Sequence, residues 1–115
     1  MNMVEINERA QGDTTIVELS GKLDASTTPS VEERLGRMIQ EGKKYLVLDF
    51  GGVTYLASSG LRMLLLVVRQ VNKLEGGLVL CRLTDTMRDT LDITGFLPYF
   101  IVVQTPEDAV TKLAP

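Results

Sequence analysis

The sequence predicts an α/β fold, in which a mixed β-sheet of about four to five strands includes an N-terminal β-hairpin and about four α-helices pack on the sheet. Two observations lead to this prediction. The first 23 residues hold two strand-like segments separated by turn residues, which indicates a hairpin. After them, apolar runs of strand length alternate with segments of helical periodicity, and this alternation favours parallel strands joined by helical crossovers.

The individual elements follow from local signals. Apolar and polar residues alternate over residues 4–8 and, less strictly, 15–19, and residues 11–13 between them are typical of a tight turn. The first helix is predicted to begin with Thr28 as its N-cap and Pro29 in its first turn. A Gly-Gly loop is predicted after the strand that ends near residue 50. The full set comprises strands at 4–8, 15–19, 44–50, 78–81 and 99–103, and helices at 28–41, 59–75, 84–94 and from 105 onward.

Composition narrows the class of protein. The 115 residues, 44% of them hydrophobic, suit one globular domain over residues 1–115. The chain shows neither a signal peptide nor an apolar run long enough to insert into a membrane, so we expect a cytoplasmic protein. Its net charge of −3, with no basic cluster, argues against direct nucleic-acid binding. It has no histidine, which excludes Ser-His-Asp catalysis, and we expect no cofactor, no metal and no catalytic residue. Cys81, the single cysteine, is expected to be a reduced core residue.

Ser58 is the first candidate site residue. Ser58 and Ser59 stand where the predicted 59–75 helix begins, and a helix N-terminus has free N–H groups that can hold an anion. A hydroxyl at this position is well placed to carry a phosphate. The competing interpretation is that the serines only begin the helix, with Ser59 as its cap.

The 59–75 helix is the second unusual feature, because it is apolar on nearly every side. One apolar face must pack on the sheet. A second strip, formed by Met63, Leu66 and Val67, lies beside basic residues. Such a helix is either deeply buried or in contact with a partner, and the sequence leaves both open.

Asp24 and Asp49 both follow strand-like segments. Paired carboxylates could bind a metal or act as acid and base. The simpler interpretation is that each one caps or turns the chain, which we prefer for Asp49. No third partner is evident for either carboxylate, so neither is assigned to catalysis.

Three motifs carry a resemblance to a known family. Gly21-Lys22-Leu23-Asp24, with the Thr-Pro helix start after it, resembles the Gly-x-Leu-Asp element of STAS domains. These are the anti-sigma factor antagonists and related cytoplasmic domains of sulfate transporters. The segment from Val47 to Leu61 resembles their central signature, and Leu91-x-Ile93-Thr94-Gly95-Phe96 resembles their late helix-ending element. The motifs occur in order over nearly the whole chain.

The resemblance implies a non-enzymatic switch. The unmodified protein would bind an anti-sigma factor that is itself a serine kinase, phosphorylation of Ser58 by this kinase would break the complex, and a serine phosphatase would reset it. One departure is Ala57, because the family usually has aspartate there. The partner-binding surface is expected to comprise Asp24, Ser58, Ser59, Gly60, Arg62, Met63 and Leu66.

Two other functions stay open. The chain could be a fixed STAS subunit of an ABC-type lipid or anion transport complex, with the apolar strip docked on an ATPase and Ser58 only starting a helix. It could instead bind a nucleotide or phosphate at residues 58–60, which the lack of a glycine-rich phosphate loop makes the weakest of the three. The apolar strip also leaves a weak homodimer open.

Overall fold

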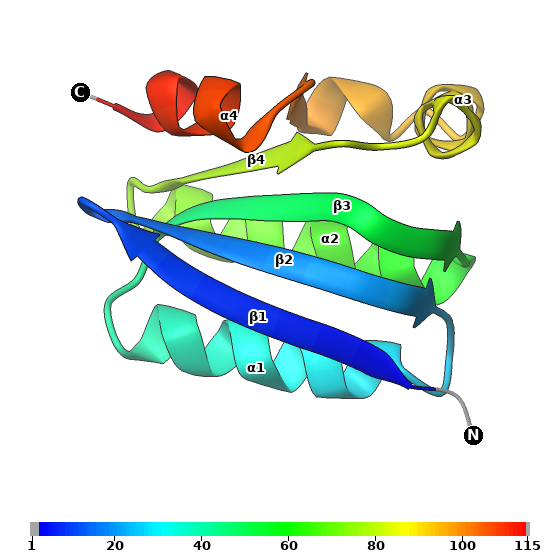
Figure 1. Ribbon diagram of the computed structural model, residues 1–115, viewed down its shortest axis with the longest axis horizontal. Helices are drawn as coiled ribbons and strands as arrows, with labels where there is room; N and C mark the ends of the chain where they lie inside the picture. The colour runs from blue at the N-terminus through cyan, green and yellow to red at the C-terminus, as the bar shows by residue number, and fades with distance from the viewer. Residues whose placement is uncertain (1–2, 115) are drawn as a thin grey trace.

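The computed structural model describes residues 3–114 and has an α/β architecture (Figure 1). Five strands form one sheet in the order β1-β2-β3-β4-β5. The β1–β2 pair is antiparallel and the other three pairs are parallel, which confirms the mixed sheet and the N-terminal hairpin. The elements in chain order are β1 (Val4–Gln11), β2 (Thr14–Leu23), α1 (Thr28–Gln40), β3 (Tyr45–Leu56), α2 (Ser58–Lys73), β4 (Gly77–Cys81), α3 (Asp85–Ile93), a 3₁₀ turn (Leu97–Tyr99), β5 (Ile101–Val103) and α4 (Pro106–Leu113).

The helices form two unequal layers. From β2 to β5 each parallel strand pairs with the next one in the chain, and right-handed crossovers in one direction place α1, α2 and α3 on the same face of the sheet. Their apolar residues share the larger core with Leu48 and Phe50 of β3. The opposite face has a small second core, where Ala109 of α4 packs on Ile16 and Val47. In Figure 1, α2 passes behind β2 and β3.

The predicted Gly-Gly loop is wrong, because β3 continues through Gly51 and Gly52 to Leu56. Its pairing with β2 has register shifts on both sides of Ser20 and Gly21. A Cβ atom at Gly52 would collide with the Ser20 side chain. The glycine therefore permits a close approach between two irregularly paired strands rather than a turn.

The helix starts differ in part from the prediction. Thr84 is the N-cap of α3, as predicted, and Thr105 has the same role in α4. The N-cap of α1 is Thr27, one residue before the predicted Thr28. The last strand is also shorter than predicted, because Pro98 lies in a 3₁₀ turn and β5 begins only after it.

Cys81 is fully buried in the second core as a free thiol, which confirms its predicted place. Burial, and then the charge of the neighbouring Asp49, raise the pKa of the thiol to about 12. The side chain therefore stays protonated and unreactive at neutral pH. Within residues 3–114, no helix has the length and apolar character that crossing a membrane requires.

Candidate functional site

Ser58 lies at the edge of the sheet where β2 and β3 end and where α1 and α2 begin. Two contacts hold this edge together. The Ala57 N–H donates to the carbonyl oxygen of Leu23 at 2.8 Å, which ties the start of α2 to the end of β2. The hydroxyl oxygens of Thr28 and Ser59 lie 3.4 Å apart, which brings the two helix starts side by side. The loop at Asp24 and the Ser58 region therefore form one continuous surface.

In the part of the chain that the structure describes, no side chain caps the start of α2. Its N-cap is Ala57, whose extended backbone (φ −88°, ψ 173°) is that of an N-cap but whose side chain has no oxygen to accept a hydrogen bond. The Gly60 and Leu61 N–H groups both donate to the Ala57 carbonyl oxygen, at 3.0 and 3.2 Å. The helix offers no acceptor to the N–H groups of its first two residues. The interpretation that Ser59 caps the helix is therefore wrong, since both serines lie within α2.

This geometry has a chemical consequence. The Ser58 side chain is exposed at the first position of a 16-residue helix, beside N–H groups that carry partial positive charge. A phosphate bound to this hydroxyl can accept hydrogen bonds from such groups. The site could thus take up a negative charge without a change in the fold.

The Asp24 loop is held by its own hydrogen bonds. One carboxylate oxygen of Asp24 accepts from the Ser26 hydroxyl at 2.7 Å, from the Ser26 N–H at 2.9 Å and from the Thr27 N–H at 3.2 Å. The Ser26 hydroxyl is the main cause that lowers the pKa of Asp24, with backbone N–H groups adding to it and burial opposing it. The carboxylate therefore stays ionised and shapes the loop beside Ser58.

The threonines that follow complete this loop. The Thr27 hydroxyl donates to the Lys22 carbonyl oxygen at 2.6 Å and accepts from the Asp24 N–H at 3.0 Å. The Thr28 hydroxyl donates to the Asp24 carbonyl oxygen at 2.6 Å. The sequence alone indicates no role in the site for Thr27 and predicts Thr28 only as a helix cap. The Thr-Thr-Pro sequence was their only signal.

The structure separates the predicted partner-binding residues of α2 into two groups. Arg62 and Leu66 are exposed, Leu66 by 42% of its surface. Met63 is only 1% exposed and Gly60 is buried, so neither offers a side chain to a partner in this structure, and their contact with a partner stays a prediction. Met63 packs in the main core, which α1 and α2 share. A Cβ atom at Gly60 would lie 2.6 Å from a methyl carbon of Leu56, so this glycine serves packing.

Asp49 does not belong to the site. Its side chain is buried within β3, accepts from the Gly51 N–H at 2.9 Å and has an oxygen 3.9 Å from Nε of Arg82. The bond to the Gly51 N–H is the local contact of a chain-turning aspartate, but β3 continues to Leu56, so the interpretation that Asp49 caps or turns the chain is wrong. The register places Asp49 opposite Glu18, well before the end of β2, so it does not pair with Asp24. Among residues 3–114, no three acidic or cysteine side chains are grouped as metal ligands.

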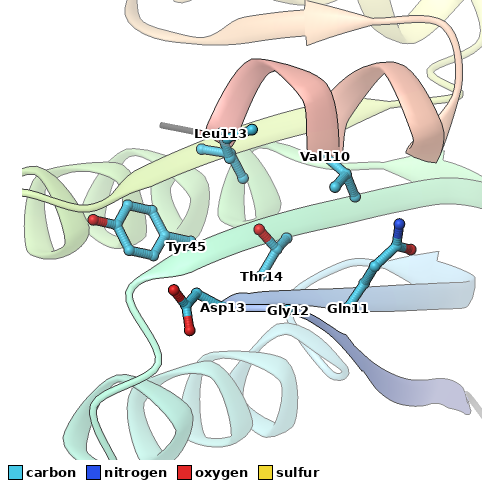
Figure 2. A pocket seen from close by; sticks show the side chains of 8 residues that line it. Gln11, Gly12, Asp13, Thr14, Tyr45, Val110 and Leu113 are labelled. Atoms are coloured by element: carbon cyan, nitrogen blue, oxygen red, sulfur yellow. The ribbon is translucent and has the colours of Figure 1, made fainter.

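Two of the hollows on the surface lie at opposite ends of β3. One, of about 520 Å³, lies far from Ser58, between the β1–β2 turn, the start of β3 and the end of α4. Figure 2 shows Leu113 and Val110 of α4 above it and Tyr45 of β3 at its side. The other, of about 320 Å³, lies next to the end of β3 that leads into Ser58, and its wall includes Tyr55 and Thr86. The second hollow therefore adjoins the candidate site.

Comparison with known proteins gives the class. The model of the STAS domain matches residues 5–109, and the chain belongs to the STAS domain family. BtrV of Bordetella bronchiseptica, named as a candidate anti-sigma factor antagonist, is 36% identical over 91 residues, which cover 79% of this chain and 78% of BtrV. The anti-sigma F factor antagonist of Paenibacillus polymyxa is 27% identical over 99 residues, which cover 85% of each chain.

Solved structures agree with this assignment. The crystal structure of an anti-sigma factor antagonist from Mycobacterium paratuberculosis superposes with a TM-score of 0.88 at 25% identity, covering 96% of this chain and 94% of the other. The phosphorylated form of SpoIIAA, a Bacillus cell fate determinant, has a TM-score of 0.74 at 20% identity, with 96% and 100% covered. The SpoIIAA likeness concerns the fold alone.

Proposed function

We propose that this protein is an anti-sigma factor antagonist of the cytoplasm, a non-enzymatic module that binds an anti-sigma factor and is switched off by phosphorylation of Ser58. The observation that carries the proposal is the exposed Ser58 hydroxyl at the uncapped N-terminus of α2. The names of the relatives from Bordetella and Paenibacillus support the class of partner. In this scheme the anti-sigma factor is a serine kinase, and a serine phosphatase restores the unmodified protein.

The physical basis of the switch is a change of surface without a change of fold. A phosphate adds about −1.5 to −2 charges at neutral pH and three strong acceptor oxygens. The N–H groups at the start of α2 and the exposed Arg62, one helical turn after Ser58, can compensate it within the chain. A partner packed over Ser58 would instead have to accommodate a hydrated dianion. Each loss of about 1.4 kcal/mol weakens the complex tenfold.

Asp24, Ser59 and Leu66 complete the proposed surface around Ser58 and Arg62. The hydrogen-bonded loop at Asp24 gives this surface a fixed edge. Leu66 adds an exposed apolar side chain on the same helix. A rigid loop, a modifiable hydroxyl and an apolar contact suit a protein interface better than the enclosed site of an enzyme.

The test combines phosphorylation with binding. The purified chain is incubated with ATP and the serine-kinase anti-sigma factor encoded in the same genome, and the intact mass and complex formation are followed together. We expect one phosphate to be added and the complex to dissociate. Ser58→Ala should stay unmodified and bound, whereas Ser59→Ala, which keeps the Ser58 hydroxyl, should still gain one phosphate. Equal phosphorylation of Ser58→Ala would refute the assignment of Ser58.

A fixed subunit of a transport complex is the second candidate. Ala57, in place of the usual acidic residue, and the exposed Leu66 favour it. In that case Leu66→Asp would release the chain from an ATPase subunit, and neither Ser58→Ala nor Ser58→Asp would change the binding. Dissociation with Ser58→Asp, together with retention of Ser58→Ala, would exclude this candidate.

A further inference from the structure

The outward side of α2 carries a strip that runs from Ser58 to the end of the helix. Successive residues of an α-helix are rotated by about 100°, so Ser58, Arg62, Arg69 and Lys73 lie within about 60° of one another. All four are exposed. With a rise of about 1.5 Å per residue, the strip is about 22 Å long. We call these four residues the α2 strip; Leu66 lies at its border.

The α2 strip is positively charged although the protein is acidic. The 16 residues of α2 contain three cations and no acidic side chain, whereas the whole chain has a net charge of −3. No ion pair found within residues 3–114 involves Arg62, Arg69 or Lys73. On the same face of the sheet, α3 has three aspartates and one arginine. The positive charge is therefore confined to the helix that begins with Ser58.

The stability of α2 itself accounts for the position of only one of these three basic residues. Lys73 lies in the last turn of α2, where a positive charge favours the negative end of the helix dipole. Arg69 lies farther from that end. Arg62 lies near the N-terminal end, where a positive charge gains nothing from the dipole. Since neither arginine has an acidic partner on its own helix, the helix itself does not account for the continuous strip.

We propose that the α2 strip is the docking surface for an acidic face of the partner, with Leu66 as the apolar contact beside it. This inference rests on the proposed function, since the partner is the one that Ser58 phosphorylation releases. Two observations favour this partner: the strip is positively charged, as a surface that binds an acidic face would be, and it is continuous with Ser58. Uncompensated exposed cations attract an acidic surface and speed its association.

The proposal gives the phosphate a second effect. A charge of about −1.5 to −2 at Ser58 would offset half or more of the +3 charge of α2. Arg62, four residues after Ser58, would be the first cation to be engaged. Phosphorylation would thus block contact at one end of the strip and weaken the attraction along its length.

The experiment uses charge reversal far from Ser58. Arg69→Glu and Lys73→Glu are compared with Lys112→Glu, an exposed lysine in the last turn of α4 on the other face of the sheet. Lys73→Glu and Lys112→Glu make the same change of charge at the same kind of helix position. Association with the purified anti-sigma factor is measured at about 50 and 200 mM salt, because exposed charges are screened over about 10 Å at 0.1 M.

We expect Arg69→Glu and Lys73→Glu each to weaken binding by about tenfold, mainly through slower association, with a smaller effect at the higher salt. Lys112→Glu should bind and be phosphorylated like the native chain, and all three variants should melt cooperatively. If the anti-sigma factor is released by Ser58→Asp but binds Lys73→Glu as well as Lys112→Glu, this inference alone is overturned. If Ser58→Asp does not weaken the complex, the proposed function fails and the inference with it.

Discussion

The starts of α2 and α3 differ in a way that separates a modifiable surface from ordinary helix stabilisation. At α3, the Thr84 hydroxyl accepts a hydrogen bond from the Met87 N–H at 3.1 Å. At α2, alanine occupies the corresponding position and no side chain caps the helix. Both N-cap residues have an extended backbone, so the difference is one of side-chain chemistry rather than of geometry.

The contrast shows that the chain lacks the stabilising effect of a side-chain cap at the start of α2. A capping side chain contributes about 1 kcal/mol, and the sequence obtains this contribution at α3 and again at α4, where Thr105 accepts from the Asp108 N–H. No such contribution is made at Ala57, the N-cap next to Ser58. The N–H groups at the start of α2 consequently remain available to an acceptor that is not a permanent side chain, such as the phosphate proposed for Ser58.

The largest expected effect is the loss of the cap at α3. Thr84→Ala should lower the free energy of unfolding by about 1 kcal/mol, because the Met87 N–H loses its acceptor. Thr84→Ser keeps the hydroxyl and serves as the control. Urea unfolding followed by circular dichroism measures the difference. If the alanine variant unfolded at the same urea concentration as the native chain, the contrast between the helix starts would have no energetic meaning.

The opposite change is expected at α2. Ala57→Asp should raise the free energy of unfolding by about 0.5–1 kcal/mol, since the backbone already has the N-cap conformation and a carboxylate can accept from the free N–H groups. The melting temperature would rise by about 2–4 °C for a chain of this size. Ala57→Leu, which adds bulk without an acceptor, should show no gain. A loss of stability with aspartate would mean that the start of α2 is not an open capping position.

A smaller effect is expected for Ser58 itself. Ser58→Ala should change the free energy of unfolding by less than about 0.5 kcal/mol, since the side chain is exposed and is not the N-cap. The same urea titration measures it. A loss as large as that of Thr84→Ala would reassign Ser58 to a structural role.

The last prediction concerns acid. The folded protein holds the pKa of Asp24 below its ordinary value of 3.8, so the ionised carboxylate adds stability above that value and the contribution disappears as the pH falls through the lower folded pKa. Melting temperatures of the native chain and of Asp24→Asn should therefore converge at low pH and differ near neutrality. A gap that is constant from about pH 2 to pH 6 would show that ionisation of Asp24 does not order the loop.

The sequence predicted the order and type of nearly all elements because most of them have local signals. The threonine caps at residues 84 and 105 and the turn at Gly12, whose φ is +61°, depend on neighbouring residues only. The length of β3, in contrast, does not depend on neighbouring residues alone. Gly51-Gly52 has the composition of a turn, and only the irregular pairing with β2 shows that these glycines lie within a strand.

The site shows the same division. The sequence predicted Ser58 at the start of a helix, but the cap that it offered, Ser59, lies within α2, and the N-cap is Ala57. It also left Met63 and Val67 between burial and partner contact. The structure resolves this, because both are almost fully buried in the core that α2 shares with α1. Which side of an apolar helix is covered depends on its neighbouring helix, and no periodicity within α2 contains that information.

The uneven distribution of helices over the sheet also bears on motion. Within residues 3–114, α4 is the one helix of the second core, and it packs there over the fully buried Cys81. A helix of eight residues held by a small core is expected to detach before the rest of the domain unfolds. The thiol would then react only during such openings. The rate at which a reagent labels the Cys81 thiol would therefore measure how often α4 detaches from the sheet.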